Sequence, residues 1–285
     1  MTANHHNDTT DNDTTDNDTT ADATTDADAG TTSNPSAMFR LDGKVVILTG
    51  ASSGLGLRFA EVLHDAGATL VLAARRLDRL EEVAARLPGS VAVRADIAVP
   101  ADCESVADVA LQRFGRIDVL VNNAGMSNQH PPESEPIASW REVMAVNLDG
   151  LFQLTQHCAT KWMLGHGGVV VNVASMLGHI SSGRMQQASY AASKGAVVNL
   201  TRELAVLWAR RQVRVNALCP GFFQTELTDE LFDSEAGQKY LRQRTPLGRN
   251  GQPHELDGAL LFLCSDASSF VTGQSLIVDG GWSAQ

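Results

Sequence analysis

Residues 45–56 read Val-Val-Ile-Leu-Thr-Gly-Ala-Ser-Ser-Gly-Leu-Gly, an apolar run that passes directly into a glycine-rich turn. The run predicts a buried strand, and a helix is expected after the turn. A turn of this kind lets backbone N–H groups approach a pyrophosphate, whose negative charge the helix dipole favours. The spacing is G-x-x-x-G-x-G, and a tight turn needs glycine in any case. Its place after the first strand nevertheless favours a dinucleotide site, made by Gly50, Ser52, Ser53, Gly54, Leu55 and Gly56.

Six further short apolar runs follow, and none alternates with polar residues. They are Leu70–Ala73, Val91–Val93, Val119–Val121, Val169–Val173, Val213–Leu218 and Leu276–Val278. Continuous apolar runs are typical of strands buried on both faces of a parallel sheet. Segments with helical spacing separate them, and one of these ends at Gly115. The sequence therefore predicts an α/β fold: a single Rossmann-type doubly wound parallel sheet of about seven strands, with helices on both faces.

Charge is unevenly placed along the chain of 285 residues, whose net charge is −11. Residues 1–37 hold eight Asp and no Lys or Arg, in repeats such as Asn-Asp-Thr-Thr-Asp. Such a segment has nothing to bury, so we expect a disordered tail before a catalytic domain at 38–285. The remainder is nearly balanced, which argues against a nucleic-acid partner. His5 and His6 are adjacent in the tail, but no metal site is expected.

The composition also indicates in which cellular compartment the protein is found. No apolar run reaches the ~18 residues that a membrane-spanning helix requires, so no membrane association is expected. The tail has no apolar stretch and is not a secretory signal. The four cysteines, Cys103, Cys158, Cys219 and Cys264, are far apart and are expected to be reduced and buried. A cytoplasmic protein is the expectation.

The end of the second strand bears on the choice of cofactor. In dinucleotide folds, a carboxylate about 20 residues past the glycines binds the ribose 2′-hydroxyl of NAD. Ala74 stands at that place, followed by Arg75 and Arg76. A guanidinium suits the 2′-phosphate of NADP(H), so we assign that role to Arg75 and expect NADP(H) to be preferred, with NAD(H) possible. The alternative is that both arginines only cap a solvated helix.

Polar residues follow the third and fourth strands. Asp96 and Ile97 come after the third strand, where a carboxylate can meet the adenine amino group, and Asn123-Ala124-Gly125 come after the fourth. Ligands of open α/β sheets bind at the carboxyl ends of the strands, so both segments are candidates for cofactor binding. Either could also be a plain turn.

Tyr190 and Lys194 lie four residues apart in a predicted helix that ends near Arg211. This spacing places phenol and ammonium on one face. A nearby ammonium favours the phenolate, so the tyrosine can exchange a proton with an alcohol while hydride moves. Ser175 ends the fifth strand, where its hydroxyl can polarise a carbonyl. Asn147 falls within a predicted helix over Trp140–Cys158, where it is either a satisfied core residue or holds a water near Lys194.

The ordered set of motifs resembles the short-chain dehydrogenase/reductase family from about Leu41 to Trp282. The matching pieces are Thr49–Gly56, Asp96, Asn122–Gly125, Asn147, Ser175, Tyr190-x-x-x-Lys194, Pro220-Gly221 with Thr225, and Val278-Asp279-Gly280-Gly281. The resemblance implies catalysis by Asn147, Ser175, Tyr190 and Lys194. It also implies that Lys194 binds the nicotinamide ribose and that the backbone around Pro220 and Phe223 orients the carboxamide. Ser53 departs from the basic residue that NADP(H) users of the family often carry there.

The expected activity is hydride transfer between NADP(H) and a small secondary alcohol or ketone. A carrier-linked 3-oxoacyl reductase, an NAD-using sugar/polyol or steroid-type alcohol dehydrogenase, and a sensor that has lost catalysis remain alternatives. Residues 126–136, 176–187 and 222–240 are expected to form the wall of the cleft. The resemblance also suggests a homotetramer, with the helices after Asn147 and after Tyr190 pairing between subunits.

Overall fold

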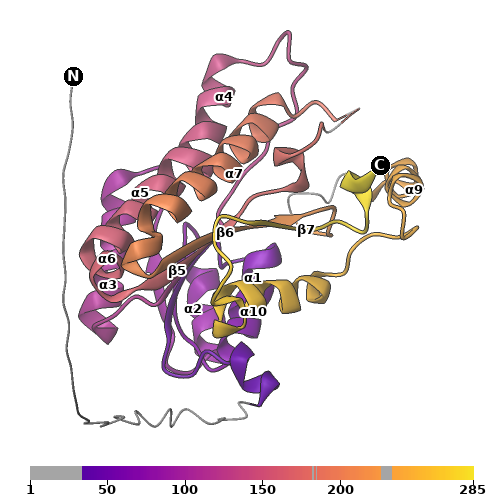
Figure 1. Ribbon diagram of the computed structural model, residues 1–285. Helices are drawn as coiled ribbons and strands as arrows, with labels where there is room; N and C mark the ends of the chain where they lie inside the picture. The colour runs from indigo at the N-terminus through magenta and orange to yellow at the C-terminus, as the bar shows by residue number, and fades with distance from the viewer. Residues whose placement is uncertain (1–33, 182, 184, 226–232) are drawn as a thin grey trace, which may run out of the picture. The chain divides into compact units, whose positions relative to one another are not determined.

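The structure is a computed structural model that describes residues 34–181, 183, 185–225 and 233–285 (Figure 1). Of the predicted tail, residues 1–33 therefore lie outside the described residues. Residues 35–37 of the tail belong to a short 3₁₀ helix, Pro35–Phe39, which Asn34 caps by accepting a hydrogen bond from the Ser36 amide. None of the helices in the described part of the chain has the length and apolar character to cross a membrane.

Seven parallel strands form one sheet in the order β3-β2-β1-β4-β5-β6-β7 (Figure 1). The strands are β1 (Val45–Thr49), β2 (Thr69–Ala74), β3 (Val91–Arg94), β4 (Val119–Asn122), β5 (Gly168–Val173), β6 (Val213–Pro220) and β7 (Ser275–Val278). Each contains one of the apolar runs in the sequence, so the predicted fold class is confirmed. The order reverses between β1 and β4, which creates a crevice at the carboxyl ends of these strands.

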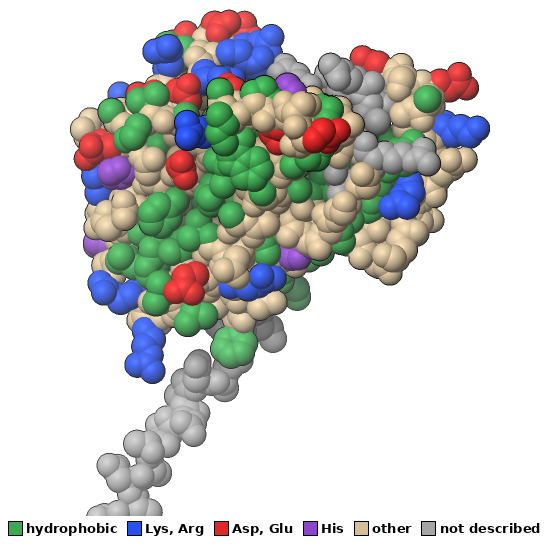
Figure 2. Space-filling model, turned by 90° about the horizontal axis from the view of Figure 1, so that it is seen from above, with side chains coloured by type: hydrophobic (Ala, Val, Ile, Leu, Met, Phe, Trp, Pro, Cys, Tyr) green, Lys and Arg blue, Asp and Glu red, His purple; other side chains and the backbone are tan. Residues whose placement is uncertain are grey.

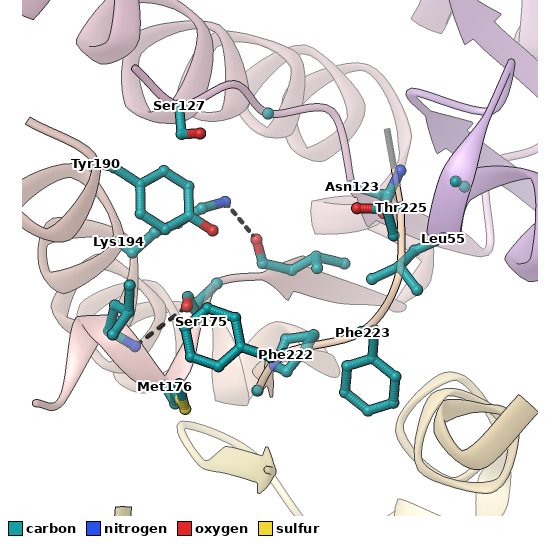
Figure 3. Close-up of a pocket in the computed structure, with 18 of the residues that line it drawn as sticks. Leu55, Asn123, Ser127, Ser175, Met176, Tyr190, Lys194, Phe222, Phe223 and Thr225 are labelled. Atoms are coloured by element: carbon teal, nitrogen blue, oxygen red, sulfur yellow. Dashed lines mark hydrogen bonds between the residues drawn. The ribbon is translucent and has the colours of Figure 1, made fainter. Parts of the chain in front are cut away.

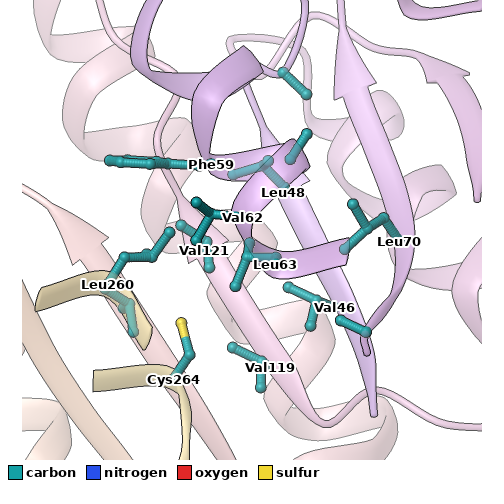
Figure 4. Close-up of a cluster of buried hydrophobic side chains, with 14 of the residues drawn as sticks. Val46, Leu48, Phe59, Val62, Leu63, Leu70, Val119, Val121, Leu260 and Cys264 are labelled. Atoms are coloured by element: carbon teal, nitrogen blue, oxygen red, sulfur yellow. The ribbon is translucent and has the colours of Figure 1, made fainter. Parts of the chain in front are cut away.

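Helices cover both faces of the sheet (Figure 1). One layer contains α1 (Gly54–Asp65), α2 (Leu77–Arg86) and α10 (Asp257–Cys264), and the other contains α3 (Pro100–Phe114), α5 (Leu151–Cys158) and α7 (Ala188–Trp208). Figure 4 shows the first layer's core, where Phe59 and Leu63 of α1 and Leu260 of α10 meet the sheet. The edge strands β3 and β7 are only partly buried, because each has a neighbour on one side alone.

The helix predicted over Trp140–Cys158 is longer and less regular than expected. It begins as α4 (Ile137–Met144), passes through a π-helical segment (Ala145–Gly150) and continues as α5; a second π segment (Ala159–Met163) leads to α6 (Leu164–His166). A β-carbon on Gly150 would lie 2.1 Å from the Ile97 carbonyl oxygen. The helix therefore packs directly on the backbone that follows β3, and tertiary packing rather than local periodicity fixes the irregular turn.

A chain of buried polar side chains joins the sheet to the α5 and α7 layer. Asn122 of β4 donates to Asn172 of β5 (2.9 Å) and to Thr155 of α5 (2.8 Å), and Asn172 donates to Thr201 of α7 (2.9 Å). All four side chains are fully or almost fully buried. Buried amides and hydroxyls with complete partners fix how neighbouring elements sit, so this chain sets the position of α7 against β5.

The remaining described helices lie between β6 and the C-terminus. They are α9 (Glu235–Arg244) and the 3₁₀ turns Pro253–Leu256, Asp266–Ser268 and Trp282–Ala284; two further 3₁₀ turns, Met176–Gly178 and Ala209–Arg211, flank α7. Trp282 packs under α9, with its ring 4.9 Å from that of Phe222 and 6.0 Å from that of Tyr240. The C-terminal end thus supports the segment that follows β6.

Candidate active site

The turn after β1 has a shape that only glycine permits. Gly50 and Gly54 have φ values of +67° and +54°. A β-carbon on Gly56 would lie 2.0 Å from the Gly50 carbonyl oxygen, so α1 starts in direct contact with the turn. Asn123, after β4, steadies the turn by donating to the Thr49 carbonyl (2.9 Å). The result is a backbone cradle at a helix N-terminus, which fits the pyrophosphate of a dinucleotide.

A cavity of about 330 Å³ lies beside this turn, at the carboxyl ends of β1, β2 and β3. Most residues predicted to bind the adenosine half line it: Gly50, Ser52, Ser53, Arg75, Asp96, Ile97, Asn123, Ala124 and Gly125. One oxygen of Asp96 accepts the Ala98 amide at 3.0 Å, which fixes the carboxylate at the rim. The lining combines polar residues with the apolar Ile97 and Val146, which fits a nucleoside.

The two arginines after β2 are placed differently from each other. Arg75 is exposed, whereas Arg76 is partly buried and reaches across to the glycine turn. Arg76 donates to the hydroxyl of Ser53 (2.6 Å) and, more loosely, to that of Ser52 (3.2 Å). Both arginines line the cavity. Arg76 was interpreted in the sequence only as a helix cap, so its reach toward Ser52 and Ser53 is a feature that sequence reasoning missed.

A second cavity, of about 190 Å³, lies at the carboxyl ends of β4, β5 and β6 (Figure 3). The predicted residues that line it are Ser53, Gly54, Leu55, Gly56, Asn123, Gly125, Ser175, Tyr190, Lys194, Pro220, Gly221, Phe223 and Thr225. Three of these residues, Ser53, Asn123 and Gly125, also line the first cavity. The two cavities therefore share one rim, as the two halves of a dinucleotide require.

Tyr190 and Lys194 point into the second cavity from the first turns of α7 (Figure 3). The Lys194 ammonium lies 5.6 Å from the centre of the Tyr190 ring and donates to the Val173 carbonyl at 2.8 Å. Burial lowers the pKa of Lys194 to about 8. Burial also raises the pKa of Tyr190, and a hydrogen bond with Ser175 opposes that rise. Phenol, ammonium and serine hydroxyl thus meet in one place, as their spacing predicted.

Asn147 lines neither cavity. Its amide accepts from the Met126 amide (2.8 Å) and donates to the Met126 carbonyl (2.9 Å) and to Ser193 (3.0 Å). A β-carbon on Gly125 would lie 3.4 Å from both Asn147 Oδ1 and Lys194 Nζ. Asn147 is therefore a buried, satisfied asparagine that also lies near Lys194, so it combines parts of both sequence interpretations.

Ser127 and Gln187, which the sequence did not single out, also line the second cavity, together with Phe222 of the predicted cleft wall. Ser127 and Gln187 belong to the segments predicted as cleft wall, but their type alone gave no signal. Among the described residues, no cluster of His, Cys, Asp or Glu could hold a metal ion. The four cysteines are free and buried, as predicted.

Comparison with known proteins identifies the family of this chain. A family model described as enoyl-(acyl carrier protein) reductase matches residues 50–283. The chain is 40% identical over 247 residues to a galactitol 2-dehydrogenase (L-tagatose-forming) of Cereibacter sphaeroides, covering 86% of this chain and 97% of that one. The chain belongs to the short-chain dehydrogenase/reductase family. It is also 39% identical over 246 residues to the 3-oxoacyl-[acyl-carrier-protein] reductase of Thermotoga maritima, covering 85% and 98% of the two chains.

A solved structure agrees with these relatives. The gluconate 5-dehydrogenase of Burkholderia cenocepacia, in complex with NADP and tartrate, superposes with a TM-score of 0.83 at 39% identity, covering 87% of this chain and 98% of that one. Membership of this family makes the chain an NAD(P)-dependent oxidoreductase that acts on alcohol or keto groups. The sensor hypothesis is thereby set aside.

Proposed function

We propose that the enzyme transfers hydride between NADP(H) and a secondary alcohol or ketone, with Tyr190 as the general acid and base. The observation that carries the proposal is the meeting of Tyr190, Lys194 and Ser175 in one cavity beside the glycine turn. Burial raises the pKa of the Tyr190 phenol, so Tyr190 can donate its proton to the carbonyl oxygen during reduction, and in the reverse direction the phenolate accepts the proton of the alcohol.

The neighbours of Tyr190 make this proton transfer feasible. Lys194, with a pKa near 8, is mostly charged at neutral pH and stabilises the phenolate that remains after proton donation. The Ser175 hydroxyl donates to the same carbonyl oxygen and polarises it. Asn147 holds the Met126 backbone beside Lys194 and is a positioning residue. NADPH supplies the hydride when it is bound.

The preference for NADP(H) rests on charge at the end of β2. Ala74 offers no carboxylate that would repel a 2′-phosphate, and two guanidinium groups line the cavity there. Pro220, Gly221, Phe223 and Thr225 form the opposite end of the binding path, where the carboxamide would lie. The NADP-bound Burkholderia structure supports this proposal.

Replacement of Tyr190 by Phe tests the catalytic role. We expect the variant to bind NADPH with unchanged affinity and to lose at least about a hundredfold in turnover, the usual effect of removing a general acid–base. Tyr240→Phe is the matched control, because Tyr240 is the chain's other tyrosine and is not among the described residues that line the cavity. A Tyr190→Phe enzyme that keeps near-normal turnover would refute the role.

A carrier-linked 3-oxoacyl reductase is the second candidate, and the Thermotoga relative supports it. Such an enzyme needs a basic surface for its acidic carrier near the cleft, and α7 offers the exposed Arg202. Kinetics with a 3-oxoacyl group on carrier protein and on a small thioester separate the two candidates. A strong preference for the carrier-bound form would favour the reductase.

We also propose a homotetramer that acts in the cytoplasm. Figure 2 shows hydrophobic side chains gathered in a broad patch on one face of the molecule. Val206 and Leu207 of α7 and Phe152 of α5 are exposed apolar residues of the two helices expected to pair. Large exposed apolar surface is typical of an interface between subunits. A monomer in light scattering at micromolar concentration would contradict the tetramer.

A further inference from the structure

The second cavity has polar groups at its mouth that the proton-transfer chemistry does not use. Ser127 and Gln187 both line it, and Ser127 stands beside the Tyr190 ring in Figure 3. Both residues are partly buried, and neither side chain has a hydrogen-bond partner among the described residues. A hydroxyl and an amide that line a cavity without a protein partner are free to bond to a ligand there.

These two residues are held in place by their backbone. Asn147 clamps the Met126 amide and carbonyl, which fixes the residue just before Ser127. Gln187 is the N-cap of α7, and its carbonyl accepts the Ala191 amide at 2.9 Å. Hydrogen bonds of the neighbouring backbone therefore hold both side chains in place at the cavity.

Two hydrogen bonds also tie the loop after β4 to the first turn of α7 and to the residues just before it. The Ser189 hydroxyl donates to Asn128 Oδ1 (2.9 Å), and the His130 amide donates to the Gln186 carbonyl (3.1 Å). This loop strap, formed by residues 126–130 and 186–189, holds the loop that carries Ser127 next to the segment that carries Gln187. A binding site fixed in this way loses little entropy when a ligand arrives.

Charge limits what the ligand can be. Among the described lining residues, Lys194 is the sole cation, and its ammonium already donates to the Val173 carbonyl. Met176, Leu177 and Phe222 supply an apolar wall. A carboxylate would find no cation beyond Lys194 among the described lining residues and would be costly to desolvate, whereas hydroxyl groups can both donate to and accept from a serine and a glutamine.

We propose that Ser127 and Gln187 bind hydroxyl groups next to the reacting carbon, so that the substrate is an uncharged polyol or its ketose rather than a sugar acid. This inference rests on the proposed function, because it concerns the substrate of the same site. A ketone without hydroxyl groups gains nothing from either side chain. Discrimination between hydroxylated and plain ketones therefore depends on these two residues.

The experiment compares three probes with NADP(H) bound: L-tagatose, a hexanone without hydroxyl groups, and the sugar acid gluconate. The wild type should oxidise the alditol of L-tagatose at least about tenfold more efficiently than gluconate, because the gluconate carboxylate must be desolvated in the cavity. Gln187→Met and Ser127→Ala should each lower kcat/KM for tagatose by about three- to tenfold, mainly through KM. Both should leave hexanone reduction unchanged.

Gln186→Met is the matched control, because the neighbouring Gln186 is exposed and does not line the cavity. It should behave as the wild type with every probe. Gluconate preferred over the polyol, or a Gln187→Met variant that loses tagatose and hexanone activity equally, would overturn the inference while leaving the proposed function intact. An enzyme that binds NADPH, measured by fluorescence, but converts none of the carbonyl probes would instead overturn the proposed function.

Discussion

Arg76 gives the sharpest prediction about cofactor choice. Arg76 is partly buried, lines the first cavity and already donates to the hydroxyls of Ser52 and Ser53. A 2′-phosphate offers a guanidinium two parallel charge-assisted bonds. We therefore predict that Arg76→Ala weakens NADPH binding and leaves NADH binding nearly unchanged.

The magnitude follows from the charge-assisted bond to the phosphate that Arg76→Ala removes. One such bond is worth about 1.5–3 kcal/mol. Its loss corresponds to roughly a ten- to hundredfold weaker Kd for NADPH in Arg76→Ala. Arg75 is exposed, so solvent competes with the phosphate, and Arg75→Ala should cost less. Ala74→Asp places a carboxylate at the end of β2 and should reverse the preference.

Fluorescence titration of both cofactors against each variant is the assay. Arg86→Ala is the matched control, since this substitution removes the same charge from the far end of α2, where Arg86 pairs with Glu61. This substitution should weaken NADPH binding by less than about twofold, because Arg86 is exposed and lies at the other end of α2 from the cavity. If Arg76→Ala weakens NADPH and NADH equally, Arg76 only shapes the glycine turn and the reasoning is wrong.

Three further predictions concern the lysine, the turn and the tail. Lys194 has a folded-state pKa near 8 against an ordinary 10.5, so the unfolded chain binds the extra proton between these values and stability rises with pH there; the melting temperature of the wild type should therefore rise relative to that of Lys194→Met from pH 7 to pH 10, and a constant difference would contradict this. Gly56→Ala should abolish NADPH binding because its β-carbon meets the Gly50 carbonyl, while Gly258→Ala, with open space around it, should not, as calorimetry can show. Deletion of residues 1–37 should leave melting temperature and turnover almost unchanged, and a large loss of stability would show that the tail packs on the domain.

The sequence was sufficient to predict the sheet because burial on both faces leaves a direct trace. Central strands such as β1 and β6 must be apolar at nearly every position, so the runs Val45–Leu48 and Val213–Leu218 stand out. The spacing of Tyr190 and Lys194 was equally readable, since α7 is a long regular helix. Both features are determined by residues close in sequence.

The features that the sequence did not predict depend on contacts between distant segments. The π turn at Ala145–Gly150 follows from the contact of Gly150 with the Ile97 backbone, and residues so far apart leave no local pattern. Which of Arg75 and Arg76 reaches the turn depends on the direction in which the chain leaves β2. Ser127 and Gln187 are common residue types, and they become notable only when folding brings both to one cavity.

The loop strap between residues 126–130 and 186–189 has a consequence for motion. The His130 amide is bonded to the Gln186 carbonyl, so it cannot exchange its proton while the strap is closed. Separating the two segments would expose this amide and free the N-cap residue Gln187, whose carbonyl accepts the Ala191 amide. The mouth of the cavity should therefore open as one cooperative unit, and native-state hydrogen exchange should give His130 and Ala191 the same opening free energy.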